Sequence, residues 1–346
     1  MLTLQKPDSI APGPGIPPSP ALVFETLNRY QHSMALKGAL ELDLFTHIAE
    51  GALTSAEIAR RSKASERGMR ILCDFLTVIG FLQKSKGVYG LTPVAATFLD
   101  RNSPAYFGTV ANFIASPEML GRFLDVASLV RDGGAGEHYS LLQPEHERWV
   151  GFAQTMKPVV GMAAQLVAPI VCRPGRQQKV LDIAAGSGIF GITIARQNPL
   201  AEIVALDWPN VLEVSQENAA LAGVQGRYQT IAGDAFQVDL GSGYDLVLVP
   251  NFLHHFDEAT VIPFLKRVHA ALRPGGTIAA VEFVPNEDRV SPPIPAMFSL
   301  MMLGTTEAGE AYTLAELNRM FRAAGFGPTE RLDLQPTPLT LIAATA

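Results

Sequence analysis

Three glycines near the middle of the chain have the spacing of a nucleotide-binding turn. Gly186, Gly188 and Gly191 follow a short run of branched apolar residues and lead into a helical segment. Glycines at such a turn let the backbone approach a ligand that a side chain would block. About 20 residues further on, Asp207 ends a second apolar run, where its carboxylate can accept hydrogen bonds from both hydroxyls of a ribose. This pattern is typical of the nucleotide-binding half of a doubly wound sheet.

Three further features favour S-adenosylmethionine over a dinucleotide. Asp182 lies four residues before the turn, in a pattern similar to the D-x-x-x-G-x-G of class I methyltransferases. Asp234 follows the third predicted strand, where it can accept from the adenine amino group while Phe236 packs near the ring. A polar segment with two histidines, 250–256, follows the fourth strand. The residues predicted to contact this cofactor, or its product S-adenosylhomocysteine, are Asp182, Gly186, Ser187, Gly188, Asp207, Trp208, Gly233, Asp234, Ala235, Phe236 and Asn251.

The two adjacent histidines, His254 and His255, are candidates for a general base. They follow a strand of the predicted sheet, at the carboxyl edge where ligands of such folds bind. A neutral imidazole can take the proton of a hydroxyl group near neutral pH. Glu282 follows the neighbouring fifth strand and could steady the imidazole from the same edge. Adjacent side chains point in different directions, so we expect one histidine to face the cleft and the other to pack or meet solvent.

The composition argues against several classes of protein. A formal net charge of −6 over 346 residues disfavours a general binder of nucleic acid or of anionic membranes. The two cysteines, Cys73 and Cys172, match neither a disulfide framework nor a metal site, so no metal is expected. The sequence has no signal-peptide pattern and no apolar run long enough to span a bilayer. We therefore expect a cytoplasmic protein with neither a nucleic acid nor a membrane as its partner.

The chain divides into four predicted regions. Proline and glycine dominate residues 1–20, which are predicted to be a disordered tail. Residues 21–100 combine helical patterns with a hairpin at 80–92, and this arrangement predicts a winged-helix domain. Residues 101–170 are predicted to be a helical linker that contributes to the substrate pocket. Residues 171–346 are predicted to form the cofactor-binding domain.

Local signals in the front domain support the winged helix and raise a second function. Thr54 and Glu57 have the spacing of a capping box, and Gly87 is expected at the tip of the hairpin. A winged helix could also belong to a DNA-binding regulator. The candidate recognition helix, however, carries only Arg67 and Arg70, whereas DNA binding usually needs several phosphate contacts from one face. We therefore favour an ordinary solvated surface.

Strands and helices continue to alternate after the glycine turn, which predicts an α/β fold with a doubly wound sheet. The run 245–249, apolar after its first residue, is expected of a central parallel strand. The next helix is predicted to start near Thr260, because this leaves Pro263 in the first turn, where proline is tolerated. Two late strands, around 329–333 and 339–343, are expected to close the sheet with an antiparallel last strand.

Four apolar side chains are candidates for the pocket of a substrate. Two of them, Met297 and Met301, belong to an insertion at 284–312, where flexible side chains could form a pliable wall for a flat aromatic molecule. The other two, Phe113 and Met156, lie in the helical linker. For all four, ordinary core packing is the alternative interpretation.

Taken together, several motifs resemble the small-molecule O-methyltransferases that carry an N-terminal winged-helix dimerisation domain. The motifs are LDIAAGSG, ALD, GDAF, NFLHHFDE, LRPGG, GEAYTLAEL and AAGF, and the resemblance covers about residues 21–346. This group includes plant phenolic, acetylserotonin and bacterial natural-product methyltransferases. The resemblance implies a Rossmann-like class I methyltransferase domain that binds S-adenosylmethionine.

The resemblance also implies roles for individual side chains. The catalytic histidine of the family lies in an L-H-D-W type motif, here L-H-H-F, and this match selects His254 over His255. The two flanking carboxylates of the family match Glu282 and Glu310. The plant enzymes have a lysine four positions before the histidine, where this chain has Pro250, so that cofactor contact is absent.

The sequence therefore predicts a methyltransferase that acts on a hydroxyl of a small aromatic secondary metabolite by in-line displacement, with His254 as the base. One alternative is the same fold performing N- or C-methylation, or a non-methylating reaction with the cofactor bound. The other is the DNA-binding regulator. The apolar front helices, 24–48, exceed what a small winged helix can bury by itself, which predicts a homodimer built through residues 21–100.

Overall fold

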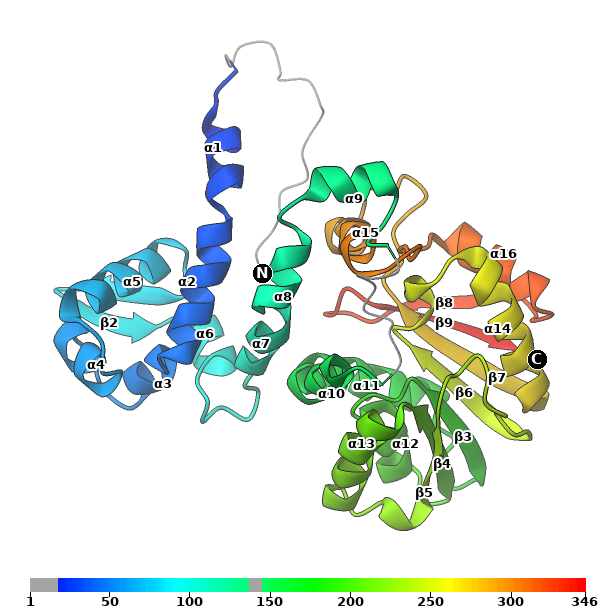
Figure 1. Ribbon diagram of the computed structural model, residues 1–346. Helices are drawn as coiled ribbons and strands as arrows, with labels where there is room; N and C mark the ends of the chain where they lie inside the picture. The colour runs from blue at the N-terminus through cyan, green and yellow to red at the C-terminus, as the bar shows by residue number, and fades with distance from the viewer. Residues whose placement is uncertain (1–17, 137–144) are drawn as a thin grey trace. The chain divides into compact units, whose positions relative to one another are not determined.

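The computed structural model describes residues 18–136 and 145–346. Most of the tail predicted over residues 1–20 therefore lies outside the described residues. The chain forms two compact units, of which the first ends at Gly108 and the second runs from Thr109 to Ala346. The predicted boundary at residue 100 lies shortly before this division. Figure 1 labels the elements of both units.

The first unit is helical with one small hairpin. The predicted capping box is confirmed, because Thr54 and Glu57 each bond to the other's backbone at the start of a helix. The hairpin turns at Lys86 and Gly87, whose φ angles of 48° and 80° suit a two-residue turn, as expected for its tip. The elements are α1 (Ala21–Asn28), α2 (Tyr30–Glu41), α3 (Leu44–Ala49), α4 (Ser55–Arg61), α5 (Glu66–Val78), β1 (Leu82–Ser85), β2 (Val88–Leu91) and α6 (Pro93–Phe98).

The helix that would enter DNA in a winged-helix regulator carries an arginine with an acidic partner. Arg70 of α5 forms an ion pair with Asp74 at 3.2 Å. Asp74 also accepts hydrogen bonds from Lys84 and Tyr89 of the hairpin. These contacts join α5 to the hairpin, so this cluster of charges stabilises the unit itself.

A seven-stranded sheet forms the centre of the second unit. Its strand order is β5-β4-β3-β6-β7-β9-β8. The first five strands are parallel, and β9 pairs antiparallel with both β7 and β8. This topology confirms the predicted doubly wound class and its antiparallel last strand. The strands are β3 (Gln178–Ile183), β4 (Ala201–Asp207), β5 (Tyr228–Ala232), β6 (Tyr244–Pro250), β7 (Leu272–Glu282), β8 (Glu330–Asp333) and β9 (Thr340–Thr345).

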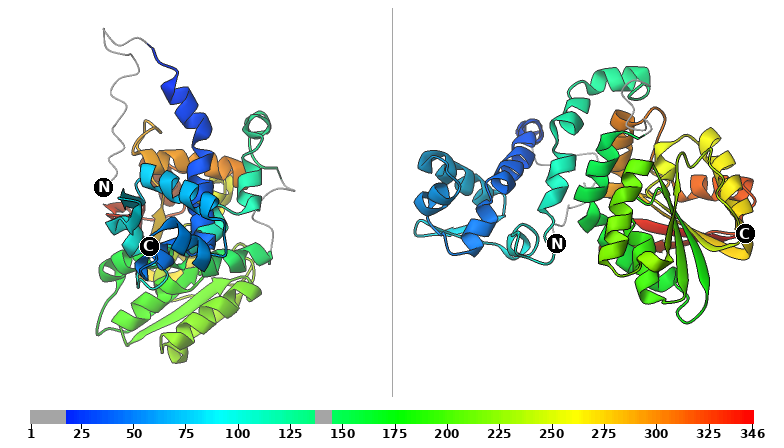
Figure 2. Two further views of the ribbon diagram at one scale, coloured as in Figure 1. Left: turned by 90° about the vertical axis from the view of Figure 1, so that its left-hand side faces the viewer. Right: turned by 60° about the horizontal axis from the view of Figure 1, so that its bottom comes forward.

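Helices cover both faces of this sheet (Figure 2). Successive residues of β3 face opposite sides, so Val180 packs with α11 and α12 while Leu181 packs with α14 and α16. Within the described ranges, no helix is long and apolar enough to cross a bilayer. The helices of this unit are α7 (Ala111–Ile114), α8 (Pro117–Arg122), α9 (Val126–Asp132), α10 (Glu147–Thr155), α11 (Lys157–Val171), α12 (Ile189–Gln197), α13 (Pro209–Leu221), α14 (Glu258–Ala271), α15 (Pro293–Thr305) and α16 (Leu314–Ala323).

The helix before β7 starts earlier than predicted. Asp257 caps α14 by accepting a hydrogen bond from the Thr260 backbone N–H at 2.8 Å, so the helix begins at Glu258. Pro263 therefore lies inside the helix, beyond its first turn. The missing N–H leaves the carbonyl of Ala259 without a helical partner, but this residue is exposed and water can bond to it. The predicted start near Thr260 was wrong: the helix begins directly after the Asp257 cap, and the burial of Val261, Phe264, Leu265 and Val268 in the core holds α14 on the sheet although it contains a proline.

The order of the strands reverses between β3 and β6. From β3, the next two strands extend the sheet on one side, whereas β6 and β7 extend it on the other. At such a point the loops after the two central strands diverge and leave a crevice for a ligand. Here those loops are the glycine turn after β3 and the histidine segment after β6. The fold therefore places both parts of the predicted site at one edge of the sheet.

Candidate active site

Each glycine of the turn after β3 has its own structural reason. Gly188 has a φ angle of 73°, and a side chain there would collide with the hydroxyl of Tyr228. Gly191 packs on β4, since a Cβ atom would lie 2.6 Å from Cγ2 of Ile203. Gly186, with a φ of 55°, is different because a Cβ there would meet a single atom, at 3.9 Å. The turn is therefore open at Gly186, where the backbone can approach a ligand.

Asp207 ends β4 beside this turn. Its two carboxylate oxygens accept hydrogen bonds from the backbone N–H groups of Gly186 and Trp208, each at 2.7 Å. Burial raises the pKa of Asp207 to about 6. Each oxygen keeps a lone pair, so the carboxylate can accept further donors such as ribose hydroxyls. The backbone N–H of Gly233 donates to the Asp207 carbonyl at 3.0 Å, which joins the ends of β4 and β5.

Asp182 lies beneath the turn and has no exposed surface. One of its carboxylate oxygens accepts from the Gly191 backbone N–H at 2.9 Å, which holds the first turn of α12. Burial, together with the charge of Asp207, raises the pKa of Asp182 to about 7. Within the described ranges, its other oxygen and the hydroxyls of Ser187 and Tyr228 are buried without a hydrogen-bond partner. The Asp182 carboxylate therefore stabilises the start of α12, directly after the glycine turn.

The loop after β5 holds the acid predicted to contact adenine. Asp234 accepts from the Phe236 backbone N–H and from the Gln237 side chain, both at 2.8 Å, so these local bonds fix its carboxylate. Phe236 packs edge-on against Phe256 with 4.7 Å between ring centroids, and Ala235 is buried beside them. These contacts connect the loop to the histidine segment.

Three other residues predicted to bind the cofactor lie on the same two sides of the crevice. Asn251 follows β6 with a φ of 52°, donates from its backbone to Val281 at 2.7 Å, and has a buried side-chain oxygen without a partner among the described residues. The carbonyl of Ser187 accepts from the Asn218 side chain at 2.9 Å. Trp208 packs against residues of α10 and α13.

The structure brings His254 and Glu282 together as a buried pair. The Nδ1 atom of His254 is hydrogen-bonded to Oε2 of Glu282, and both residues are 3% exposed. The other carboxylate oxygen accepts from the backbone N–H groups of Phe252 at 3.1 Å and Leu253 at 2.8 Å. An ionised carboxylate can only accept, so Nδ1 carries the ring proton. The lone pair of Nε2 is thereby left for an incoming proton.

Two aromatic residues that were not predicted from the sequence flank this pair. Phe298 of α15 meets the His254 ring edge-on, with centroids 4.9 Å apart. Phe283 stacks on Phe298 at 3.9 Å with an interplanar angle of 19°. Phe283 directly follows Glu282, and Phe298 directly follows Met297. Their position next to two predicted site residues was the one feature of the sequence that could have indicated them.

His255 has different neighbours. Its ring meets Trp149 of α10 edge-on at 6.0 Å, and its Nδ1 atom is buried without a partner in the described part of the chain. Burial, and secondly the neighbouring His254, hold the pKa of His255 well below its usual range. His255 is therefore a neutral side chain, and its contacts differ from those of the histidine that Glu282 holds.

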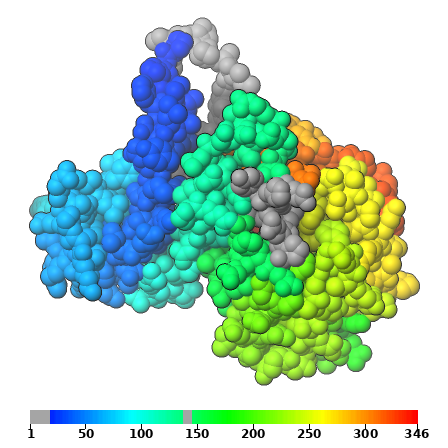
Figure 3. Space-filling view, in the orientation of Figure 1, coloured from blue at the N-terminus to red at the C-terminus, as the bar shows by residue number. Residues whose placement is uncertain are grey.

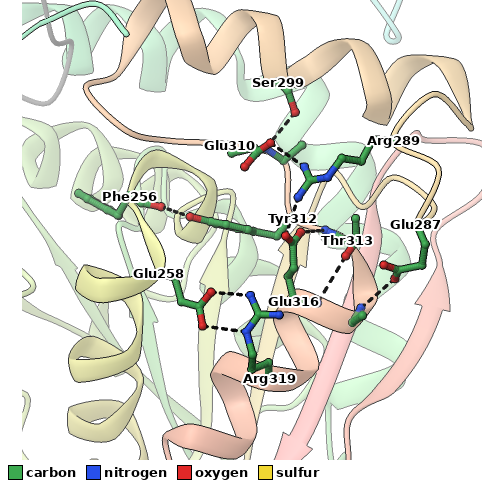
Figure 4. A network of polar contacts seen from close by, with 12 residues as sticks. Phe256, Glu258, Glu287, Arg289, Ser299, Glu310, Tyr312, Thr313, Glu316 and Arg319 are labelled. Atoms are coloured by element: carbon green, nitrogen blue, oxygen red, sulfur yellow. Dashed lines mark hydrogen bonds and ion pairs between the residues drawn. The ribbon is translucent and has the colours of Figure 1, made fainter. Parts of the chain in front are cut away.

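Glu310 lies apart from this pair. Its carboxylate forms an ion pair with Arg289 at 2.6 Å (Figure 4). No hydrogen bond or ion pair within the described ranges joins it to His254. Its catalytic role, which the family resemblance implied, stays a prediction.

The four predicted pocket residues lie on two helices and one junction. Phe113 of α7 packs edge-on against an aromatic ring of α10 at 5.0 Å. Met156 lies between α10 and α11. Met297 and Met301 belong to α15, where Met297 is 61% exposed and Met301 is half-buried. These two share their helix with the phenylalanine that contacts His254, whereas the role of all four in binding a substrate stays a prediction.

Two family models match the chain. The model of the O-methyltransferase domain matches residues 134–327. The model of the O-methyltransferase dimerisation domain matches residues 24–101. The chain belongs to the O-methyltransferase family. The dimerisation model falls on the helical first unit, and the other model covers the sheet from β3 to β7.

Relatives in this family match nearly the whole chain. The chain is 31% identical over 320 residues to 3-hydroxy-5-methyl-1-naphthoate 3-O-methyltransferase from Streptomyces sahachiroi, a match that covers 90% of this chain and 92% of that protein. It is 26% identical over 325 residues to acetylserotonin O-methyltransferase from Mus musculus, covering 88% and 83% of the two chains.

Solved structures share the fold. A crystal structure of an O-methyltransferase candidate from Nostoc punctiforme is 48% identical, with a TM-score of 0.91 and coverage of 96% of this chain and 100% of that chain. Human N-acetylserotonin methyltransferase in complex with S-adenosylmethionine has a TM-score of 0.82 at 22% identity, covering 96% and 99%. The O-methyltransferase family depends on S-adenosylmethionine, and the open turn at Gly186 beside the carboxylate of Asp207 fits a nucleoside of this kind.

Proposed function

We propose that this O-methyltransferase methylates the hydroxyl of a small aromatic metabolite, with His254 as the general base. The observation that carries the proposal is the buried His254–Glu282 pair, which lies at the sheet edge that also holds the glycine turn. The stacked rings of Phe283 and Phe298 beside the histidine favour a flat acceptor. The relatives that methylate a hydroxynaphthoate and acetylserotonin support the same class of acceptor.

Bound S-adenosylmethionine supplies an electrophilic methyl group on a sulfonium. The protein must align the acceptor oxygen, exclude water and remove the acceptor proton. Because Glu282 holds the proton on Nδ1, the Nε2 atom of His254 can accept the hydroxyl proton as the oxygen becomes a nucleophile. The carboxylate then stabilises the imidazolium, a division of labour known from hydrolase triads. Phe298 restricts the ring and shields it from water.

The proposed cofactor site lies on the other side of the crevice. Asp207 would accept the ribose hydroxyls, and Gly186 would let the backbone approach the ligand. Asp234 and Phe236 lie after the next strand, where they would meet the adenine. The side-chain oxygen of Asn251, which has no partner within the described ranges, would accept from a donor on the cofactor.

Replacement of the histidine tests the proposal. We expect His254→Ala to bind S-adenosylhomocysteine as the wild type does, but to lose about 10²- to 10⁴-fold in turnover of a phenolic acceptor at pH 7. The loss should shrink as the pH approaches the pKa of the phenol, about 10, because the acceptor then ionises unaided. His255→Ala is the matched control and should lose far less. Turnover of His254→Ala within twofold of wild type at pH 7 would exclude His254 as the base.

We also propose that the protein is a homodimer built through its first unit. The match to a dimerisation domain over residues 24–101 supports this. Helix α1, dark blue in Figure 3, and the start of α2 carry apolar side chains that are exposed to solvent. Each is more than half exposed, and patches of this kind usually mark an interface. They are Leu22, Val23, Phe24, Leu27 and Tyr30.

A further inference from the structure

The chain between β7 and α16 makes two close contacts with the histidine segment. The first comes from Phe298, whose ring meets that of His254. The second comes from Gly309, where a Cβ atom would collide with the carbonyl oxygen of His254 and lie 2.9 Å from the carbonyl carbon of His255. Only a glycine allows this approach of one backbone to another. The placement of Gly309 therefore limits where the backbone of His254 can lie.

An arginine fixes the residue that follows this glycine. Arg289 lies at the start of the same segment, and its guanidinium contacts Glu310 at 2.6 Å and Glu316 at 2.5 Å (Figure 4). Glu316 is itself held, because its other oxygen accepts from the backbone N–H of Thr313 at 2.9 Å in the capping box of α16. Arg289 thus connects the beginning of the segment, its end and the first turn of a packed helix.

A second connection joins the same region to the histidine segment. The hydroxyl of Tyr312 donates to the carbonyl of Phe256 at 2.5 Å, two residues after His254. Glu287 accepts from the backbone N–H of Ala315 at 3.0 Å. Figure 4 shows these bonds around the ion pairs of Arg289. The polar network therefore extends from the histidine segment to the loop that carries Arg289.

We propose that Arg289 is a positioning residue for methyl transfer, and that it acts through Glu310 and the neighbouring glycine rather than through contact of Glu310 with the histidine. By holding Glu310, Arg289 keeps Gly309 against the backbone of His254 and so fixes the orientation of that ring. The proposal rests on the proposed function, because it assumes that His254 is the base. It also accounts for the ion pair of a carboxylate that the family resemblance assigned to catalysis.

Because the ion pair between Arg289 and Glu310 is exposed, its loss should change the position of the segment more than the stability of the protein. Arg289 is 40% exposed and Glu310 is 45% exposed, and ion pairs this accessible contribute little to overall stability. Arg289 has a positive φ of 55°. Glutamine, like arginine, is unbranched at Cβ, so Arg289→Gln adds no backbone strain at this position. Loss of the ion pair should therefore free the segment without unfolding the protein, whereas small misplacements of reacting groups reduce turnover strongly.

The test uses three variants: Arg289→Gln, Glu310→Gln and the double variant that combines these two changes. Each is compared with Arg319→Gln. Arg319 is the matched control, since it lies on α16, near Glu316, but pairs with Glu258 of α14 instead of Glu310. We expect the first two variants to lose about ten- to a hundredfold in kcat, with unchanged affinity for S-adenosylhomocysteine and an unchanged midpoint in the pH profile. The double variant should lose no more than either single one. Arg319→Gln should stay near wild type.

Hydrogen exchange gives a readout that does not depend on turnover. Amides of residues 252–256 and 306–312 should exchange faster in Arg289→Gln than in the wild type or in Arg319→Gln. If the wild type methylates no hydroxyl, the proposed function fails, while faster exchange in Arg289→Gln would still show that Arg289 holds Gly309 against the histidine segment. Unchanged exchange and kcat within twofold of wild type would overturn the positioning role. An additive double variant, or a Glu310→Gln loss far above that of Arg289→Gln with a shifted pH profile, would assign Glu310 a direct catalytic role instead.

Discussion

At the scale of single residues, the two carboxylates at the sheet edge differ in how completely they are hydrogen-bonded. Glu282 accepts two backbone N–H groups and the ring N–H of His254. A buried charge is costly unless it is bonded in this way. Among the described residues, Asp207 accepts from two backbone donors only, and burial raises its pKa to about 6. A ligand that donates to Asp207 would therefore compete with a proton.

This competition predicts pH-dependent binding of S-adenosylhomocysteine. Donors on the ribose favour the ionised carboxylate, so bound ligand should lower the pKa of Asp207 from its ligand-free value of about 6. Affinity should therefore be constant above pH 7 and should fall by up to about tenfold per unit below pH 6, where the free carboxylate is protonated. Calorimetry from pH 5 to pH 8 measures this dependence.

Two variants at the same position control that measurement. The amide of Asp207→Asn lacks the charge and one acceptor oxygen of the carboxylate, so the affinity of this variant should be at least about tenfold weaker than that of the wild type at pH 7. Because the amide does not titrate, this affinity should change little with pH. Asp207→Ala removes the acceptor altogether and should bind no better. If affinity in either variant equals that of the wild type at pH 7, Asp207 does not contact the ligand. A slope that persists in Asp207→Asn would point to Asp182, whose pKa is about 7, as the titrating group.

At the scale of elements, the packing of α12 on β4 depends on one glycine. A Cβ atom at Gly191 would lie 2.6 Å from Ile203 and 3.0 Å from Oδ2 of Asp182. We predict that Gly191→Ala lowers the free energy of unfolding in urea by about 1–3 kcal/mol, the usual cost of overpacking. Gly161→Ala in α11 is the control, because a Cβ there meets nothing within 4 Å. It should raise the free energy of unfolding by roughly 0.5–1 kcal/mol. Equal effects of the two substitutions would contradict the packing explanation.

Several elements of both units could be predicted because their signals are local. Glycines at the turn, apolar runs such as 246–249 and the capping box at Thr54 each depend on a few consecutive residues. The start of α14 depended on more than its local sequence. Asp257 caps the helix at Glu258, and the burial of its apolar side chains in the core holds α14 on the sheet although Pro263 lies inside it. A rule about proline alone could not include this tertiary packing.

The site could be predicted only in part, because its partners come from distant segments. His254 and Glu282 follow adjacent strands, so sheet topology alone brings them to one edge. The partner of Glu310 depends on a loop that begins well before it and carries Arg289. Phe298 reaches the histidine from a helix whose packing angle the sequence does not specify. Contacts of this kind are set by tertiary structure.

At the scale of the whole molecule, the N-terminal end of the first unit exposes apolar side chains that the rest of the described chain does not cover. No residue of α1 is buried within the chain, although five of its eight residues are apolar: Ala21, Leu22, Val23, Phe24 and Leu27. An isolated helix of this length is not stable in water by itself. A second copy of the chain could cover this surface on both partners, and a two-fold pair is the commonest closed arrangement.

We therefore predict that light scattering at micromolar concentration gives the mass of two chains. Replacing Phe24 and Leu27 by glutamate places charges in the proposed interface of both copies, so the dissociation constant should rise at least about a hundredfold and the mass should fall to that of one chain. Leu221→Glu is the matched control, because Leu221 is 85% exposed on α13 of the second unit and should leave the dimer intact. A wild-type protein with the mass of a single chain would contradict the homodimer. A Phe24→Glu/Leu27→Glu protein that keeps the mass of two chains would place the interface on another surface.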